Sequence, residues 1–256
     1  MIVNDTNLVF YIAHYYSNIQ SLQLLKLSIQ SIQRFYPHSD IVVCESPSLL
    51  KETAYDDISG VNVIINPIPN SSVIGCFKEY MKRYETSNKK GIFIHDSMVL
   101  KGRFDDEKLS RQFGFIWSFS QYHEPRDTCN EELGKFLHNY LNINDMNCDD
   151  YVGDFGPSVY GSYESIVALW NETPFELFMT YEDRKGVILD LERIIGAVAF
   201  KLKLVTSTEN CALCGDIFDD GARFGRGYEG ETLEEIIADP YKESAIKFWC
   251  GRLNLL

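Results

Sequence analysis

The stretch "GIFIHDSMVL", residues 91–100, places polar and charged side chains directly after a run of apolar ones. We predict a buried strand here, on which His95, Asp96 and Ser97 stand side by side. A carboxylate that loses its hydration needs an ion pair, hydrogen bonds or a cation. Asp96 therefore indicates one of two arrangements. It caps backbone N–H groups in a turn, or it binds a metal ion or a sugar hydroxyl group.

Alternating strand and helix patterns precede this stretch. Apolar runs at 8–16, 40–46 and 61–69 predict strands, and the helical spacing of apolar residues at 17–36 and 71–86 predicts helices between them. Strands separated by helices are typical of βαβ units. We therefore predict an α/β fold of Rossmann type, with a mixed, mostly parallel sheet flanked by helices.

The second half of the chain is less regular. Residues 113–123 suggest another strand, and residues 130–142 and 186–204 suggest helices. Residues 149–173 read as a loop, rich in glycine and aromatic residues, that runs into a helix. Since nothing resembles an interdomain linker, we predict a single domain with an irregular C-terminal part.

Polar groups follow three of the predicted strands. Because the carboxyl ends of parallel strands meet at one edge of a sheet, where α/β proteins bind ligands, we expect these groups to lie together. They are Ala13-His14-Tyr15-Tyr16, Cys44-Glu45-Ser46 and His95-Asp96-Ser97. This convergence predicts a binding site at that edge.

The overall composition narrows the classes of partner. A formal net charge of -13 argues against general affinity for nucleic acid, because phosphate binding relies on clustered Lys and Arg. No apolar run approaches the roughly 18 to 20 residues that span a bilayer. The first residues, MIVNDTNLVFYIAH, do not resemble a secretion signal. We expect a cytoplasmic protein with no membrane span and no nucleic-acid partner.

The order of these elements resembles nucleotide-sugar glycosyltransferases of the GT-A fold, of the stand-alone, soluble type that microbes and large DNA viruses contain. The resemblance covers about residues 6–204. The stretches that carry it are LVFYIAHYYSN (8–18), LLKLSIQSIQRFYPHSDIVVCESPS (24–48), NSSVIGCFKEYMKR (70–83), IFIHDSMVL (92–100), GDFGPSVYGSYESIVALW (153–170) and VILDLERIIG (187–196). The stretch IFIHDSMVL (92–100) stands where the family has its Asp-x-Asp signature.

The resemblance implies a nucleotide-sugar-binding half at 1–104, and an acceptor-binding half with a C-terminal tail at 105–256. The residues that it implies as contacts of the nucleotide sugar are Ala13, His14, Tyr15, Glu45, Ser72, Lys78, His95, Asp96 and Ser97. For His14 a structural role, with its ring bonded to the backbone, is an equal alternative.

Metal use is left open by a departure from the family pattern. Where the family has two carboxylates, the triplet His95-Asp96-Ser97 has one. Either Mn2+ or Mg2+ is held by Asp96 with His95, or the site is metal-independent and nearby cations offset the phosphate charge. The candidate cations are Lys78, Lys82, Lys247 and Arg252.

The acceptor half supplies candidates for sugar binding and for proton transfer. Tyr160 and Tyr163 are predicted as aromatic platforms for the acceptor, or else as core tyrosines. Asp190 and Glu192 are predicted as the catalytic base, with Asp154 as the next choice; the alternative for the first two is a charge on a helix surface. Because Asp190 and Glu192 are two residues apart on a helix, only one of them can face a cleft.

The sequence therefore predicts a glycosyltransferase, hexosyl- or pentosyl-, that moves a sugar from a nucleoside diphosphate sugar to a glycan hydroxyl. We expect inversion with a carboxylate base. The alternative is a non-catalytic nucleotide- or sugar-binding α/β module. A methyltransferase-like Rossmann fold is disfavoured, since "AHYYSN" (13–18) lacks the glycine-rich loop that such a fold needs after its first strand.

Overall fold

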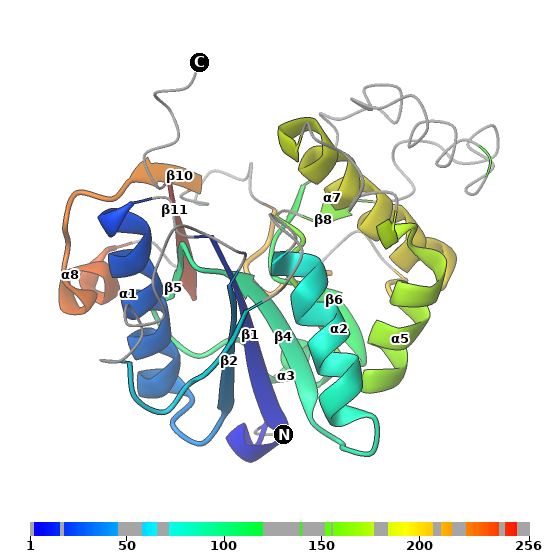
Figure 1. Cartoon of the computed structure of the whole chain (residues 1–256), viewed down its shortest axis with the longest axis horizontal. Coiled ribbons are helices and arrows are strands. Elements are labelled where there is room, and N and C mark those ends of the chain that lie inside the picture. The colour runs from blue at the N-terminus through cyan, green and yellow to red at the C-terminus, as the bar shows by residue number, and fades with distance from the viewer. Residues whose placement is uncertain are drawn as a thin grey trace.

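The computed structural model of the chain describes residues 3–15, 18–45, 58–65, 72–119, 139, 152–154, 156–176, 184–206, 211–216, 224–240 and 244–249. A six-stranded sheet forms its centre, and helices cover both faces (Figure 1). The predicted α/β class, with a mixed and mostly parallel sheet between helices, is confirmed.

The strands of this sheet run in the order β3 (Asn62–Ile65), β2 (Asp40–Glu45), β1 (Leu8–His14), β4 (Lys90–His95), β9 (Val159–Gly161) and β6 (Phe113–Phe115). The first four are parallel to one another, and β9 pairs antiparallel with both β4 and β6. The chain passes from β3, at one edge of the sheet, to β4 on the far side of β1. Strand β1 therefore lies between β2 and β4, and its carboxyl end is flanked by theirs.

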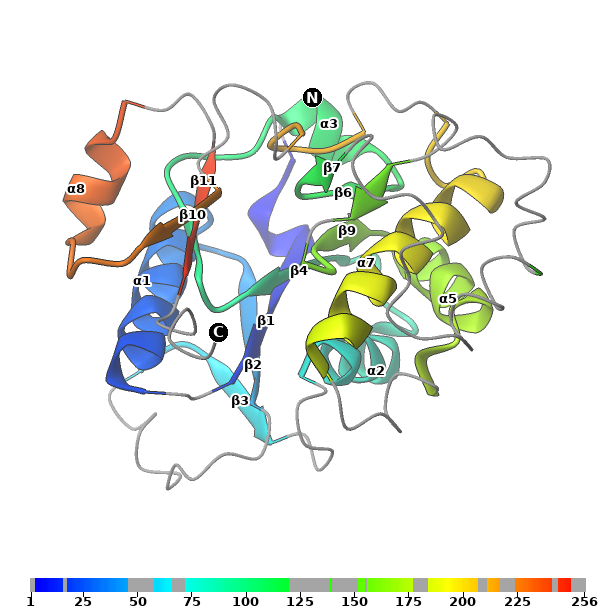
Figure 2. The ribbon, with the colours of Figure 1, turned by 90° about the horizontal axis from the view of Figure 1, so that it is seen from above.

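The helices are placed by the alternation of side chains along β1. Leu8, Phe10 and Ile12 pack with α1 (Ile19–Phe35), whereas Val9, Tyr11 and Ala13 belong to the core on the opposite face. That opposite face is covered by α2 (Ser72–Tyr84), α5 (Tyr163–Glu172) and α7 (Arg184–Lys201). Figure 2 shows these three helices together on one side and α1 on the other. A strand buried on both faces explains the nearly continuous apolar run.

The prediction of a single strand over residues 91–100 is wrong. Strand β4 ends at His95, the chain turns at Asp96 and Ser97, and β5 (Met98–Leu100) leaves the main sheet. It joins a three-stranded sheet with β11 (Ala245–Trp249) and β10 (Phe224–Gly227). The turn is fixed on both sides, because the Asp96 N–H donates to the Ala13 carbonyl (3.1 Å) and the Phe248 N–H to the Ser97 carbonyl (2.8 Å).

The predicted loop at 149–173 also contains strands. Strand β8 (Gly153–Asp154) pairs with β7 (Ser118–Phe119), and β9 follows shortly afterwards. The predicted helix at 130–142 lies outside the described residues apart from Asn139. The remaining elements are the 3-10 helix η1 (Asp5–Asn7), α3 (Asp106–Ser110) and α8 (Leu233–Ala238).

Helix α7 packs against β8 with its backbone at Gly196. A Cβ atom there would lie 2.1 Å from the Val152 carbonyl oxygen and 3.0 Å from the Gly153 Cα. Because backbone cannot move aside as a side-chain tip does, we expect Gly196→Ala to destabilise the protein by about 2 kcal/mol or more. Chemical denaturation measures this.

The matched control is Gly102→Ala, since a Cβ atom at Gly102 meets no atom of the described residues within 4 Å. Its free energy of unfolding should stay within about 0.5 kcal/mol of the wild-type value. Equal unfolding midpoints for both variants would contradict the close approach of α7 and β8.

None of the helices in the described part of the chain combines the length and the apolar character needed to cross a membrane.

Candidate functional site

The predicted strand ends meet at one edge of the main sheet. In the parallel register His14 lies opposite Glu45, and Ala13 lies opposite His95. Asp96 follows directly after β4, where its own N–H is bonded to the Ala13 carbonyl. The polar groups of β1, β2 and β4 are thus brought together by the pairing of three strands, before any loop is considered.

The His14 ring lies between two carboxylates. Its Nδ1 is 2.6 Å from Asp96 Oδ2, and its Nε2 is 3.4 Å from Glu45 Oε2. The first is a short hydrogen bond, and the second is a contact between charged groups. His14 and Glu45 are 0% and 2% exposed, whereas the Asp96 side chain is 13% exposed. The three form the His14 cluster, of which Asp96 is the member that reaches the surface.

The pKa values of this cluster favour an ion pair. Burial lowers the pKa of His14, but the hydrogen bond and charge of Asp96, with the charge of Glu45, outweigh it and the pKa is raised. Burial raises the pKa of Asp96, but the hydrogen bond and charge of His14 dominate and the pKa is lowered. Smaller contributions to Asp96 come from the His95 charge and from the Tyr15 N–H at 3.4 Å. Asp96 is therefore an ionised carboxylate with a fixed orientation.

His95 connects this cluster to a second one through Gly156. Its Nε2 is hydrogen-bonded to the Gly156 carbonyl, which also accepts a bond from Ser158 Oγ at 2.7 Å. Gly156 has a φ of 67°, which side-chain-bearing residues rarely adopt. A Cβ atom there would lie 2.6 Å from Lys247 Nζ and 3.4 Å from the His95 ring. Glycine thus leaves the space in which the Lys247 amine approaches the end of β4.

The second cluster contains two buried carboxyl groups. Glu192 on α7 is 5% exposed, and its Oε1 accepts the Gly156 N–H at 2.8 Å. Asp154 on β8 is fully buried; its Oδ1 accepts the Ser158 N–H at 3.1 Å, and its Oδ2 has no hydrogen-bond partner among the residues that the structure describes. Lys247, from β11, completes this Glu192 cluster.

The pKa values of these two acids are raised. Burial raises the pKa of Glu192 to about 7, even though Lys247, the Gly156 N–H and Arg193 favour its charged form. Burial, and then the charge of Glu192, raise the pKa of Asp154 well above its usual range. An acid with a pKa near neutrality exchanges protons readily at physiological pH, which is the property required of a general base. Of the two acids, Glu192 is the one whose pKa lies near neutrality.

Other predicted site residues lie elsewhere or are only partly described. Tyr160 is buried in the core, where its hydroxyl donates to the Lys108 carbonyl at 2.8 Å. Tyr163 packs near Tyr80, with ring centroids 6.2 Å apart. The Lys78 amine lies 5.7 Å from the centroid of the Trp170 ring. The structure therefore gives these three side chains partners outside both clusters.

For four more of the predicted residues the structure describes little beyond their place in the chain. Lys82 is exposed on α2. Ser72 is the first residue of α2, and Asp190 lies on α7, but their side chains are outside the described part of the structure. Arg252 also lies outside it.

Two residues of the site were not singled out from the sequence. Gly156 bonds to both His95 and Glu192, and Ser158 bonds to Gly156 and Asp154. Their stretch, "GDFGPS" (153–158), carries the glycine and proline signals of a turn. Those signals indicate a turn, but the partners of the turn come from α7 and β4, which only the fold can identify.

The residues predicted to hold Mn2+ or Mg2+ fit such an ion poorly. Asp96 Oδ2 is already bonded to His14 and lies 3.4 Å from the Tyr15 N–H. A carbonyl oxygen only accepts hydrogen bonds, so the His95 Nε2 that faces Gly156 must donate, and only its Nδ1 could ligate a metal. Within the described residues no group of three or more His, Cys, Asp or Glu could hold a metal ion.

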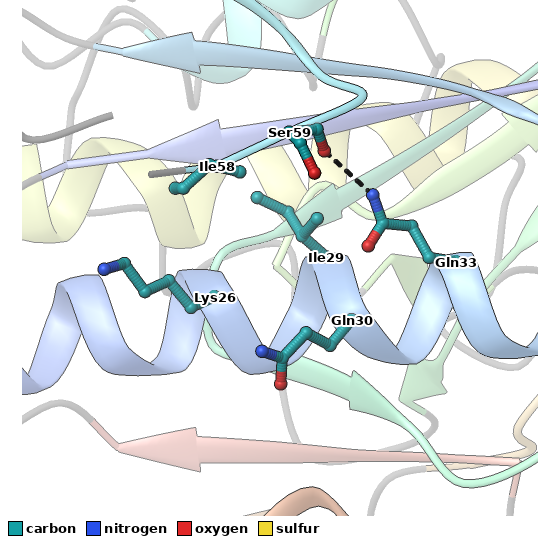
Figure 3. Close-up of a pocket in the computed structure, with 6 residues that line it drawn as sticks. All are labelled: Lys26, Ile29, Gln30, Gln33, Ile58 and Ser59. Atoms are coloured by element: carbon teal, nitrogen blue, oxygen red, sulfur yellow. Dashed lines mark hydrogen bonds between the residues drawn. The ribbon is translucent and has the colours of Figure 1, made fainter. Parts of the chain in front are cut away.

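A separate pocket of about 200 Å³ lies beside α1. Its lining residues are Lys26, Ile29, Gln30, Gln33, Ile58 and Ser59 (Figure 3). The Gln33 side chain donates to the Ser59 carbonyl at 3.0 Å across it. No member of the His14 or Glu192 cluster lines this pocket, so it is not part of the candidate site.

Comparison with known proteins returns structures only. No family model matches the chain, and no curated protein matches it. Solved structures do match the chain, and three of them are a mannosyltransferase, a core-mannan synthase and a galactosyltransferase. The mannosyltransferase Ktr4p from S. cerevisiae in complex with GDP is 12% identical, with a TM-score of 0.42, over 79% of this chain and 68% of that one. Core-mannan synthase A from Aspergillus fumigatus, in a Mn/GDP form, is 9% identical, with a TM-score of 0.40, over 76% and 68%.

The third is the galactosyltransferase LgtC in complex with donor and acceptor sugar analogs. It is 7% identical, with a TM-score of 0.42, over 95% of this chain and 87% of that one. Against another structure of Ktr4p, the chain spans 64% of the length of the protein that it matches. At such identities and TM-scores the function of this chain has to be argued from its own residues.

Proposed function

We propose that the chain is a glycosyltransferase that moves a sugar from a nucleoside diphosphate sugar to a hydroxyl group of a glycan. The observation that supports it is the connection of two unlike acids at one sheet edge. Asp96 is held ionised by His14, and Glu192, with a pKa near neutrality, is joined to the same strand end through Gly156 and His95. Such a transfer needs a fixed hydrogen-bond acceptor that positions the donor and a proton acceptor for the acceptor hydroxyl.

On the donor side, Asp96 is proposed to accept hydrogen bonds from hydroxyl groups of the ribose or the transferred sugar. Charge-assisted hydrogen bonds of this kind are about twice as strong as neutral ones. His14, which is buried, acts on the donor only by orienting Asp96. Lys247, whose amine lies beside Gly156 and His95, is proposed to contact the diphosphate as the leaving group gains negative charge.

On the acceptor side, Glu192 is proposed as the general base. The acceptor hydroxyl oxygen bonds to the anomeric carbon while the bond from that carbon to the diphosphate oxygen breaks. Glu192 takes the hydroxyl proton, and the nucleoside diphosphate leaves with the bonding electron pair. Such a single displacement inverts the anomeric centre. Of the three acids predicted for this role, Asp154 is less suited, since it is fully buried and its pKa is raised further by Glu192.

The test is a screen of UDP-, GDP- and dTDP-linked sugars, first for binding by thermal shift and then for release of the nucleoside diphosphate with glycan acceptors. A ligand that binds only the folded state stabilises it by mass action, about 2.7 kcal/mol at a hundredfold excess over Kd. Binding of a nucleoside diphosphate sugar with acceptor-dependent turnover is expected. Failure of every such donor to bind would refute the proposal.

A non-catalytic binding module is the competing function, and the screen separates it from an enzyme. It would bind a donor without turnover with any acceptor. A buried acid of raised pKa costs stability and is unnecessary for binding alone, so the Glu192 cluster favours the enzyme.

Replacing Lys247 by Gln is expected to raise the KM for the donor about tenfold or more, because one charge-assisted hydrogen bond to a phosphate contributes about 1.5 to 3 kcal/mol. Steady-state kinetics with varied donor measures it. Lys201→Gln is the matched control, since Lys201 is exposed at the end of α7. A wild-type KM in Lys247→Gln would assign the diphosphate to other cations.

A further inference from the structure

We propose that the His14 ring, which lies between Asp96 and Glu45, takes the place of a divalent cation as the partner of the Asp96 carboxylate, so that this chain binds its donor without a resident metal ion. For the identity of the donor this inference rests on the proposed function. The behaviour of the protein toward metal ions does not depend on it.

The geometry of the ring is the first support. The two ring nitrogens point to different carboxylates, at 2.6 Å from Asp96 Oδ2 and 3.4 Å from Glu45 Oε2. An ion such as Mg2+ needs its oxygen ligands at about 2.1 Å. With the ring between them the two oxygens are too far apart for one ion to bind both, and the ring is fixed there by full burial. It is held by its own strand, β1, whose neighbours β2 and β4 carry the two acids.

The remaining donor atoms of the described residues at this edge are the second support. His95 directs its Nε2 to the Gly156 carbonyl, so only its Nδ1 keeps a lone pair, and Asp96 has Oδ1 beyond the oxygen that His14 and Tyr15 share. Lone carboxylate oxygens hold Mg2+ only together with waters and substrate phosphates. An ion held by Asp96 together with waters and the phosphates of the donor is the competing arrangement. It requires metal for nucleotide binding, whereas an Asp96 paired with His14 does not.

The positive charge that a diphosphate requires has another source within the same edge. The Lys247 amine lies beside Gly156 on β11, next to the His95 ring. An ammonium group binds phosphate as a point charge and needs no further ligands. A donor held between Asp96 and Lys247 would therefore meet a carboxylate at its hydroxyl groups and a cation at its phosphates.

The experiment has one arm with metal alone and one with nucleotide. In the first, the unfolding temperature is measured in EDTA and in 1 to 5 mM Mn2+ or Mg2+ (concentrations on the order of those used to saturate weak sites). We expect the wild-type value to change by less than about 1 °C, because mass action stabilises only a state that binds the ion. A rise of several degrees that Asp96→Asn removes would overturn the inference, whatever the function of the protein.

In the second arm, calorimetry measures the affinity for GDP, UDP or dTDP with EDTA and with Mn2+. The two dissociation constants should agree within about twofold. Binding that appears only with Mn2+, and that Asp96→Asn abolishes, would overturn the inference while supporting the proposed function. If none of the nucleotides binds in either condition, the proposed function fails and the metal-alone arm still decides the inference.

Variants of His14 add a positive test. His14→Ala opens the space between the two carboxylates, so this protein, unlike the wild type, should gain an unfolding temperature several degrees higher in Mn2+ than in EDTA. His14→Gln keeps a side chain there and should gain less. A folded His14→Ala protein that shows no response to Mn2+ would overturn the inference. Should His14→Ala fail to fold, the two wild-type arms decide it.

Discussion

Replacing Glu192 by Gln is expected to abolish sugar transfer while making the protein more stable above neutral pH. Gln keeps the shape of the side chain and an oxygen for the Gly156 N–H, which Glu192 accepts at 2.8 Å. It cannot take up a proton from an acceptor hydroxyl. Because a positioned general base contributes a factor of about 10² to 10⁴, we expect kcat/KM to fall by about that factor. Donor binding should persist.

The gain in stability follows from the raised pKa of Glu192. Burial raises this pKa from 4.5 to about 7, so the folded state holds the proton more tightly than the unfolded state does. Below pH 4.5 both states are protonated and the wild type carries no penalty. Between pH 4.5 and about 7 the unfolded state loses its proton first, and the wild type becomes less stable as the pH rises. Above pH 7 the penalty is on the order of 3 kcal/mol.

Denaturant unfolding of both proteins at pH 5 and pH 8 tests this. The free energy of unfolding of Glu192→Gln should exceed the wild-type value by more at pH 8 than at pH 5. The kcat/KM of the wild type should rise with pH on a limb centred at about 7, the pKa of Glu192. Glu107→Gln, an exposed acid on α3, is the control and should change neither property. A Glu192→Gln protein with wild-type turnover would exclude the base assignment.

Asp96→Asn is expected to reduce transfer about 100-fold and to destabilise the fold. Asn retains a hydrogen-bond acceptor for His14 Nδ1, but the carboxylate charge that faces the ring is lost. A hydrogen bond to a charged group contributes about 1.5 to 3 kcal/mol, and the loss of one such bond to the donor gives an effect of this size in kcat/KM. Removal of one partner of a buried ion pair adds a loss of stability of about 1 to 3 kcal/mol.

Asp40→Asn is the matched control, because Asp40 begins the same strand that Glu45 ends. Its Oδ2 is 2.5 Å from Lys89 Nζ, and its side chain is 42% exposed, so this is an ion pair near the surface. Such pairs contribute about 0 to 1 kcal/mol. Steady-state kinetics and thermal unfolding should show a loss in Asp96→Asn that Asp40→Asn does not share. If both variants behave alike, Asp96 has no special role at the sheet edge.

The first half of the fold could be predicted because its signals are local. The apolar run of β1 and the helical spacing of α1 are read from neighbouring residues, and β1 and α1 both form within two residues of the predicted bounds. The meeting of His14, Glu45 and Asp96 was also predictable. It follows from one rule, that parallel strands end at the same edge.

The Glu192 cluster could not be assembled from the sequence in the same way. Its members come from β8, α7 and β11, and their contacts depend on the Gly156 turn and on the approach of α7 to β8 at Gly196. The division of residues 91–100 into two strands was missed for a similar reason. Hydropathy gives β4 and β5 the same apolar character, but β5 pairs with β11, which is distant in sequence. Whether a strand continues or turns away is decided by that partner.

The pairing of β5 with β11 has a consequence for how the protein is made. A ribosome releases β1, β2 and β4 long before residues 245–249, so a nascent chain can assemble the His14 cluster while Lys247 is still unsynthesised. During that interval the edge of β5 that later receives β11 has no strand to bond with, and open edges of this kind recruit strands from other chains. Arrival of β11 covers the edge and brings Lys247 to it, so a chain interrupted before residues 245–249 should be prone to aggregate.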